Sequence, residues 1–328
     1  MHKTCAIITI GYEHRLLPSV YLLVFIIGLV TNGLGLKSLL PKWKKLGNIN
    51  VFVLNLGFAN VLYLPMLPFL VVYYFKKSTW IFGDAFCKIT RFCFNLNLYG
   101  SIGFLTCISV YRYLAIVHPM RVKGRITVTQ SVAISVMVWL LVGVQSLPDM
   151  FYAKTNEGNT SAKCYHTTTG AYVEDYLKYS LGWTLTGFCI PLLITLGCYG
   201  HVIVVLCRKN TTHMELRQRS LRLLFILILL FSVCYIPYHV FKNLTLWSRV
   251  LNKQKICPEW SNIVYIAHQI SRGLVCLNSA LNPLVYLHVN EEIPAQVRQL
   301  LQRARQMFNR LFLSNSDSSP VAQTVDED

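Results

Sequence analysis

The sequence has little charge, and acidic residues are its scarcest charged type. Only 14% of its 328 residues are charged, and 14 Asp and Glu stand against 31 Lys and Arg. Soluble domains carry about 25% charged residues. This chain is 54% hydrophobic, and so few charged residues could not cover the apolar surface of a soluble fold. The shortage of charge excludes an ordinary soluble domain and is typical of a membrane protein.

The sequence also lacks the patterns of several functional classes. A net charge of +17 would indicate nucleic-acid binding in a soluble protein, but here the basic residues are spread over short segments between apolar runs. The sequence contains no recognisable metal-ligand cluster, Gly-rich phosphate loop or nucleophile–base pair. We therefore expect neither an enzyme nor a metal, a cofactor or a nucleic-acid partner.

Long hydrophobic runs are what the sequence does contain. Each is long enough to cross a bilayer as a helix, because a backbone in lipid must satisfy its own hydrogen bonds. No repeat relates the two halves, which disfavours a transporter. We predict an all-α membrane protein with an N-terminal segment 1–16, seven transmembrane helices within 17–288, an amphipathic membrane-surface helix at 289–312 and a disordered tail at 313–328. The runs are 17–40, 49–74, 85–117, 128–150, 173–207, 220–246 and 261–288.

The basic residues predict the orientation. Segments 42–45, 121–125, 208–222 and 298–310 are rich in Lys and Arg, and the positive-inside rule places them and the C-terminus in the cytoplasm. The N-terminus then lies outside, as does the glycosylation sequon at Asn159. The opposite loops are basic as well, which favours an anionic external ligand; for most of their lysines a solvated surface is the alternative. These loop residues are Lys76, Lys77, Lys154, Lys163, Arg249, Lys253 and Lys255.

Four of the eleven cysteines lie outside the apolar runs, at Cys5, Cys87, Cys164 and Cys257. Their spacing matches no zinc pattern. Four thiols on one side of a membrane indicate two disulfides formed in an oxidising compartment.

Three helical stripes of polar residues predict a binding pocket at the outer end. Ionisable groups inside membrane helices are costly unless paired or hydrated, so they usually face a cavity. Arg91, Lys242 and Arg272 have no acid at helical spacing, and a polyphosphate would supply the missing charge. Lys242 could instead snorkel to the headgroups, and Tyr99 and Tyr265 could be ordinary aromatic packing. The stripes are Arg91, Asn95 and Tyr99; His239, Lys242, Thr245 and Arg249; and Tyr265, His268, Gln269 and Arg272.

Short motifs in every run carry a family resemblance. They include Asn32 in GLVTN, NLGFAN at 55–60, Tyr111-Arg112-Tyr113, Trp139, Pro191, CYIP at 234–237 and NPLVY at 282–286. In this order they resemble the rhodopsin-type G-protein-coupled receptors. WIFGDAFCKITRF, YRYLAIVHP, YIPYHVFK and HQISRGLVCLNSALNP resemble the purinergic nucleotide receptors, most closely the adenine-nucleotide branch.

The resemblance implies specific roles for residues of this chain. It pairs Cys87 with Cys164 and Cys5 with Cys257, and it makes Tyr165 and Thr167 lid contacts over the pocket. Tyr111 stands where the family usually has an acid just before Arg112. Tyr199 and Tyr286 are therefore expected to hold Arg112 instead. Asn60 stands where the family usually has an aspartate and a sodium ion. The implied activation switch comprises Tyr111, Arg112, Tyr113, Tyr199, Phe231, Tyr235, Pro237, Asn282, Pro283 and Tyr286, with Ile102 and Pro191 packing against it.

Together with the polar stripes, the resemblance implies a plasma-membrane receptor that binds extracellular ADP- or ATP-like nucleotides and activates a heterotrimeric G protein through the phospholipase C and calcium route. A receptor for a small carboxylate or another anionic metabolite is the alternative, and a transporter is a more distant one.

Overall fold

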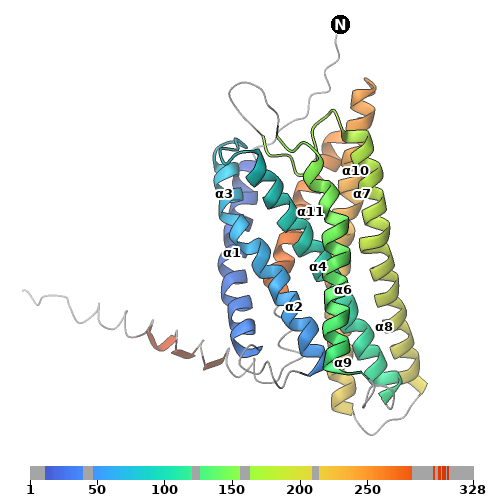
Figure 1. Cartoon of the computed structure of the whole chain (residues 1–328). Coiled ribbons are helices and arrows are strands. Elements are labelled where there is room, and N and C mark those ends of the chain that lie inside the picture. Colours follow the sequence, from blue (N-terminus) through green and yellow to red (C-terminus); the bar gives the residue numbers. More distant parts are fainter. Residues whose placement is uncertain are drawn as a thin grey trace, which may run out of the picture.

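The computed structural model describes residues 12–39, 47–119, 126–155, 163–208 and 214–282, together with parts of 298–309. Within these ranges the chain is helical, and the one β-type pairing is an isolated antiparallel bridge between Thr155 and Cys164. Figure 1 shows the helices side by side in one elongated bundle. The predicted all-α membrane fold is confirmed. The surface-helix and tail boundaries at 289–312 and 313–328 fall largely outside the described residues.

The helices follow the predicted apolar runs closely, because length and hydropathy are local properties of the chain. Three of the seven spans are made of two helices each. In chain order the elements are α1 (Tyr12–Leu39), α2 (Asn48–Tyr63) with α3 (Leu67–Phe75), α4 (Asp84–Val117), α6 (Val128–Phe151), α7 (Val173–Thr184) with α8 (Ile190–Arg208), α9 (Met214–Leu230) with α10 (Ile236–Lys253), and α11 (Ser261–Leu281).

Six of these spans are long and apolar enough to cross a membrane among the described residues. The seventh, α11, also packs along the bundle between α1 and α10, but one of its faces is polar. His268, Gln269, Ser271 and Arg272 are all buried there. These polar residues lower the mean hydropathy of α11, but they lie inside the bundle and leave an apolar face outward. The helix α11 therefore serves as the seventh span.

Irregular turns divide the composite spans. Pro65 lies in a 3₁₀ turn at Leu64–Met66 between α2 and α3, and proline cannot donate the backbone hydrogen bond that an α-helix needs. π-helical turns at Leu185–Cys189 and Phe231–Tyr235 precede α8 and α10. Such turns are rare and are frequent at functional sites. No residue pattern in the sequence predicted these turns.

The long helix α4 is the centre of the bundle. It packs against α2, α6 and α8, and its middle residues Ile102, Phe104 and Leu105 have no exposed surface. The same helix carries Arg91 toward one end and Arg112 near the other. The end of the bundle that contains Arg91 also contains the α6–α7 loop (residues 152–155 and 163–172) and is called the disulfide end below.

Candidate ligand-binding cavity

A cavity of about 510 Å³ opens at the disulfide end, within the size range of small-molecule sites. Its walls come from α3, the turn after α3, the α6–α7 loop, α10 and α11. Eight of the thirteen predicted ligand-binding residues line it: Tyr165, Thr167, Thr245, Arg249, Tyr265, His268, Gln269 and Arg272. Tyr73, Tyr74, Lys77 and Lys163 line it too and were not among the predicted ligand residues.

The cavity wall is strongly positive. Lys77, Lys163, Arg249 and Arg272 face it, and neither Asp nor Glu is among its lining residues. Because a cation in a partly enclosed site attracts anions over a longer range than in bulk water, this wall favours a negatively charged molecule over a neutral one.

Arg272 is the most deeply placed cation of the wall, with only 4% of its surface exposed. One guanidinium nitrogen donates to Oε1 of Gln269 at 2.6 Å, and the group lies 6.0 Å from the ring centre of Tyr74. No carboxylate of the described residues forms an ion pair with Arg272. The guanidinium therefore keeps donors and a full charge for a ligand.

Arg249 links α10 to the α6–α7 loop across the cavity. Its two terminal nitrogens donate to Oγ1 of Thr167 and to the carbonyl of Thr168, each at 2.8 Å. Its guanidinium also lies 5.8 Å from the ring centre of Tyr165. Both predicted lid residues, Tyr165 and Thr167, are thus held at the cavity by one arginine.

The α6–α7 loop is fixed to the bundle by the predicted Cys87–Cys164 disulfide, which is present. The amide of Tyr165 donates to the carbonyl of Lys154 at 2.7 Å. Arg91 donates to the carbonyl of Cys164 at 2.9 Å and contacts Nδ1 of His166 at 3.4 Å. Arg91 therefore lies beneath the loop and supports it, and it is absent from the cavity lining.

His166 inserts from the loop into the bundle and is held in one tautomer. Arginine can only donate, so Nδ1 of His166 accepts from Arg91, and Nε2 carries the proton that bonds the Tyr238 hydroxyl at 2.8 Å. Burial, with the positive charges of Arg272, Arg91 and Lys242 and the nearby His268, holds the pKa of His166 well below its usual range. A neutral imidazole is therefore built into the floor of the cavity. His166 was not among the residues predicted from the sequence to bind a ligand.

The buried position of His166 predicts a loss of stability in mild acid. Histidine in the unfolded chain titrates near pH 6.5, whereas folded His166 stays neutral to lower pH, so below about pH 6.5 the unfolded state binds more protons. We expect the thermal stability of the purified protein to fall between about pH 6.5 and 5. The contribution of one such group reaches about 1.4 kcal/mol per pH unit.

The variant His166→Gln isolates this contribution, because an amide can accept from Arg91 and donate to Tyr238 without titrating. Its unfolding temperature is expected to depend less steeply on pH over the same interval. An identical slope in the variant would show that His166 does not stay neutral in the folded protein.

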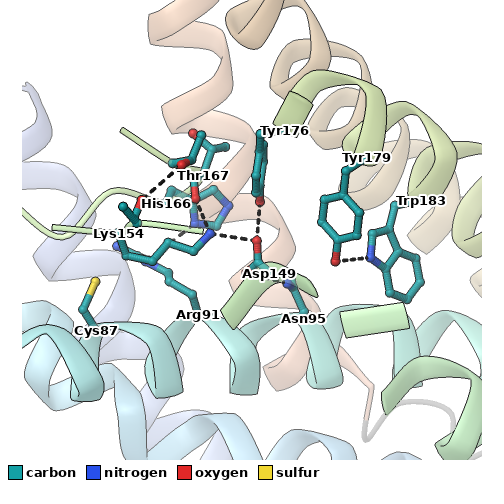
Figure 2. Close-up of polar contacts among 12 residues, drawn as sticks. Cys87, Arg91, Asn95, Asp149, Lys154, His166, Thr167, Tyr176, Tyr179 and Trp183 are labelled. Carbon is teal, nitrogen blue, oxygen red and sulfur yellow. Dashed lines mark hydrogen bonds and ion pairs between the residues drawn. The ribbon is translucent and has the colours of Figure 1, made fainter. Parts of the chain in front are cut away.

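A buried ion pair that was not predicted from the sequence lies behind the cavity lining, between Asp149 and Lys154 (Figure 2). Asp149, at the end of α6, is 1% exposed and accepts from Lys154 Nζ at 2.7 Å, the Tyr176 hydroxyl at 2.7 Å and Asn95 Nδ2 at 3.1 Å. Lys154 also donates to the carbonyl of Thr167. Burial lowers the pKa of Lys154, and Asp149 opposes that shift.

This ion pair corrects the expectation of a solvated outer surface in the case of Lys154, which has no exposed surface. A sequence signal was available, because Asp149 is the one acid in the run 128–150, and an ionisable residue inside an apolar span rarely lacks a partner. Its partner could not be identified from helical spacing, since Lys154 lies beyond the end of the helix.

The remaining predicted ligand residues lie deeper and do not line the cavity. Tyr99 stacks on Trp183 with ring centres 3.9 Å apart, and Gly187 leaves room for this stack. His239 stacks on Phe188 at 4.3 Å. Tyr99 is thus packed against an aromatic ring, which is the alternative predicted for it from the sequence. Asn95, as noted, donates to Asp149.

Lys242 also lies inside the bundle rather than at the headgroup level. It is 4% exposed, and its ammonium lies 5.8 Å from the Tyr238 ring centre and 6.0 Å from that of Tyr176. No hydrogen bond or ion pair joins Lys242 to the described residues, although Asp149 attracts it. The snorkelling interpretation is therefore wrong. The three cations Arg91, Lys242 and Arg272 are not brought to one wall.

A second polar region links the middles of α1, α2, α4 and α11. Asn60 accepts from Asn97 at 3.1 Å and Asn282 at 3.0 Å, and donates to Asn32 at 2.8 Å. Asn278 donates to the Tyr235 hydroxyl in the π-helical turn. No carboxylate among the described residues belongs to this network. The Asn282 amide also donates to the Ser101 hydroxyl at 3.4 Å, so the predicted switch residues Tyr235 and Asn282 are each bonded to neutral side chains.

The other predicted switch residues are spread over α4, α8, the π-helical turn and α10. Tyr111, Arg112 and Tyr113 lie in the last turns of α4, and the Tyr113 hydroxyl contacts Nδ1 of His201 in α8 at 3.0 Å. Phe231 shares the π-helical turn with Tyr235, and Tyr199 lies in α8. Pro237 is the second residue of α10. Pro283 and Tyr286 lie outside the described residues.

The remaining disulfide and glycosylation predictions are only partly covered. Cys257 is disulfide-bonded, and its predicted partner Cys5 lies outside the described residues, as does the sequon residue Asn159. At a second sequon, the Asn243 amide donates to Oγ1 of Thr184 at 2.8 Å and to the carbonyl of His239 at 2.9 Å. Its side chain is therefore occupied within the bundle.

The helical bundle and its motifs match a known family. The model of the 7 transmembrane receptor (rhodopsin family) matches residues 32–286. The chain belongs to this family. Its relatives include purinoceptor 1 of Homo sapiens, 39% identical over 98% of this chain and 85% of the relative, and purinoceptor 1 of Gallus gallus, 38% identical over 98% and 88%. The 2-oxoglutarate receptor 1 of Rattus norvegicus is 33% identical over 88% of this chain and 85% of the relative.

Membership in the rhodopsin family explains why the two ends of the bundle differ. A receptor of this family binds a ligand at one face and a G protein at the other, and it is a multi-pass membrane protein. The cavity lies at the disulfide end. The opposite end carries Tyr111, Arg112 and Tyr113 in the last turns of α4.

Proposed function

We propose that this protein is a plasma-membrane receptor for extracellular nucleotides of the ADP or ATP type. The observation that carries the proposal is the cavity itself, whose lining contains four cations and no acid. Phosphate groups form short, charge-assisted and often bidentate hydrogen bonds with arginine. Arg272, Arg249, Lys77 and Lys163 would bind the phosphates.

The tyrosines of the cavity favour a nucleotide over a small carboxylate. Tyr73, Tyr74, Tyr165 and Tyr265 line the same space as the cations, and a planar base that stacks on an aromatic ring gains about 1–3 kcal/mol. A small dicarboxylate would satisfy the cations but would leave these rings and much of the volume without contacts. A dicarboxylate receptor is therefore the second candidate, supported by the 2-oxoglutarate receptor among the relatives.

Each remaining predicted residue has a place in this proposal. Thr167, Thr245, His268 and Gln269 provide polar contacts around the ligand. Arg91, Asn95, Tyr99, His239 and Lys242 form the inner support on which the α6–α7 loop and the cavity floor rest. The N-terminus and Asn159 lie outside, and the C-terminus lies in the cytoplasm beside membrane lipid and the G protein.

Signal transfer would run from the cavity through the π-helical turn to the cytoplasmic end. Phe231 and Tyr235 lie in that turn, and Tyr235 is bonded to Asn278 of α11. A π-helical turn has an extra residue in its hydrogen-bond ring and can shift register, so it is a suitable place for α9 to move relative to α10. Arg112, together with Tyr111, Tyr113, Tyr199 and Tyr286, would then expose the surface that activates the G protein and the phospholipase C route.

The direct test records calcium and cyclic nucleotides in cells that express the receptor, against nucleoside tri- and diphosphates and dicarboxylates. A nucleotide response absent from untransfected cells supports the proposal. A response to dicarboxylates with none to nucleotides would replace it by the second candidate.

The neutral network around Asn60 predicts that sodium has little effect on agonist affinity. Sodium prefers carboxylate ligands at such a site, and the described network offers only amide and hydroxyl groups. Sodium chloride and choline chloride at equal concentration are expected to lower affinity alike, by ionic-strength screening. Agonist competition binding measures this. A strong loss with sodium that choline does not reproduce would contradict the prediction.

A further inference from the structure

Buried charge in this protein is unevenly distributed. Arg91, Lys154, Lys242 and Arg272 are each at most 4% exposed, whereas Asp149 is the one buried acid among the described residues. Buried cations are stable only when they are paired, hydrogen-bonded or met by a ligand. Three positive charges therefore remain without a buried carboxylate, and the position of Asp149 decides where that excess lies.

Asp149 offsets the positive charge of the two buried lysines, Lys154 and Lys242, which lie behind the cavity lining. It pairs with Lys154 at 2.7 Å and attracts Lys242 at longer range. Its carboxylate also accepts from the Tyr176 hydroxyl and from Asn95, so the group is held from α4, α7 and the α6–α7 loop (Figure 2). These contacts leave Asp149 little freedom to leave its position.

The cations that face the cavity have no such acid beside them. Arg272 and Arg249 face the cavity, while Lys154, Lys242 and Asp149 are absent from its lining. Thr167 lies between these two sets of cations, because it accepts from Lys154 through its carbonyl and from Arg249 through its hydroxyl. The excess positive charge is therefore concentrated toward the cavity, with a built-in negative charge just behind it.

We propose that Asp149 is a specificity-determining residue that limits how much negative charge the ligand carries. The proposal deepens the proposed function and rests on it. The Asp149 carboxylate repels the anionic groups of the ligand through the loop, and each additional ligand charge increases that repulsion. Removing this charge thus favours a triphosphate over a monophosphate, whereas removing the Lys154 charge does the reverse.

The expected size follows from Coulomb's law. Two unit charges about 10 Å apart, at an effective dielectric constant of about 20, change a binding constant on the order of tenfold. Because mono-, di- and triphosphates of one nucleoside share the base and ribose, the ratio of their dissociation constants isolates the charge term. A purely structural role for Asp149 would change all three constants together and leave the ratio unaltered.

The test uses membranes that contain the full-length receptor, with competition binding of the three phosphates in EDTA to prevent magnesium from neutralising them. Asp149→Asn is expected to raise the preference for triphosphate over monophosphate about tenfold, and Lys154→Met to lower it by a similar factor. The double variant restores the neutral pair and is expected to return near the wild-type ratio. Asp175→Asn is the matched control, because Asp175 is 70% exposed in its ion pair with Lys178.

The outcomes are distinguishable. An unchanged ratio in Lys154→Met overturns the proposal even if Asp149→Asn does not reach the membrane. A parallel loss of affinity for all three phosphates assigns the pair a purely structural role and also overturns it. If the wild type binds no nucleotide, the proposed ligand class is wrong; mono-, di- and tricarboxylates then provide the same comparison by thermal stabilisation of the purified receptor, with the same reversal of preference expected.

Discussion

Replacing Arg272 with alanine is expected to raise the nucleotide concentration for a half-maximal response at least about 100-fold. The guanidinium lines the cavity, is almost fully buried and forms no ion pair with the described residues, so its charge is available to a phosphate. Two charge-assisted hydrogen bonds at about 1.5 kcal/mol each amount to about 3 kcal/mol. That energy corresponds to about 100-fold in affinity.

Surface expression must be unchanged for this result to report binding. Arg272 donates to Gln269 one turn earlier in its own helix, and its contact with another helix is with the Tyr74 ring of α3, so surface expression is measured alongside the response. Lys178→Ala is the matched control, because Lys178 is 82% exposed on α7 and absent from the cavity lining. The calcium response of the control is expected to match that of the wild type. Unchanged potency in Arg272→Ala at normal expression would remove the phosphate contact from the proposed function.

Replacing Cys87 and Cys164 together with serine is expected to abolish the receptor at the cell surface at 37 °C. The disulfide joins residues 77 positions apart, and closing a loop of that length contributes about 4–5 kcal/mol through the entropy of the unfolded chain. The same bond holds the loop that carries His166, Lys154 and Thr167 against the bundle. Its loss therefore removes both stability and one wall of the cavity.

Surface labelling and nucleotide binding of the double serine variant measure the two effects. Cys189→Ser is the control, since Cys189 is a free, half-buried cysteine away from the loop, and wild-type expression is expected for it. Double-variant receptors rescued at low temperature are expected to bind nucleotide weakly. Normal surface level and normal affinity at 37 °C would show that Arg91, Asp149 and Arg249 hold the loop without the disulfide.

The bundle was predictable because its signals are local. A run such as 85–117 spans a bilayer by its length and hydropathy alone, and α4 begins and ends within one residue of it. The polar stripe on α11 was equally readable, since His268, Gln269 and Arg272 recur at helical spacing and all three line the cavity. The breaks at Leu185–Cys189 and Phe231–Tyr235 were not readable, because a π-helical turn depends on packing rather than on a residue pattern.

The amino-acid sequence by itself determined a seven-helix membrane bundle with positive charge on the faces of its helices, because composition and periodicity require no knowledge of neighbours. Only the tertiary structure decided how those charges are shared. It brings Asp149 to Lys154 and Arg91 to the α6–α7 loop, and it leaves Arg272 facing the cavity. Electrostatic pairing depends on distances between segments far apart in the chain, and those distances exist only once the helices have packed.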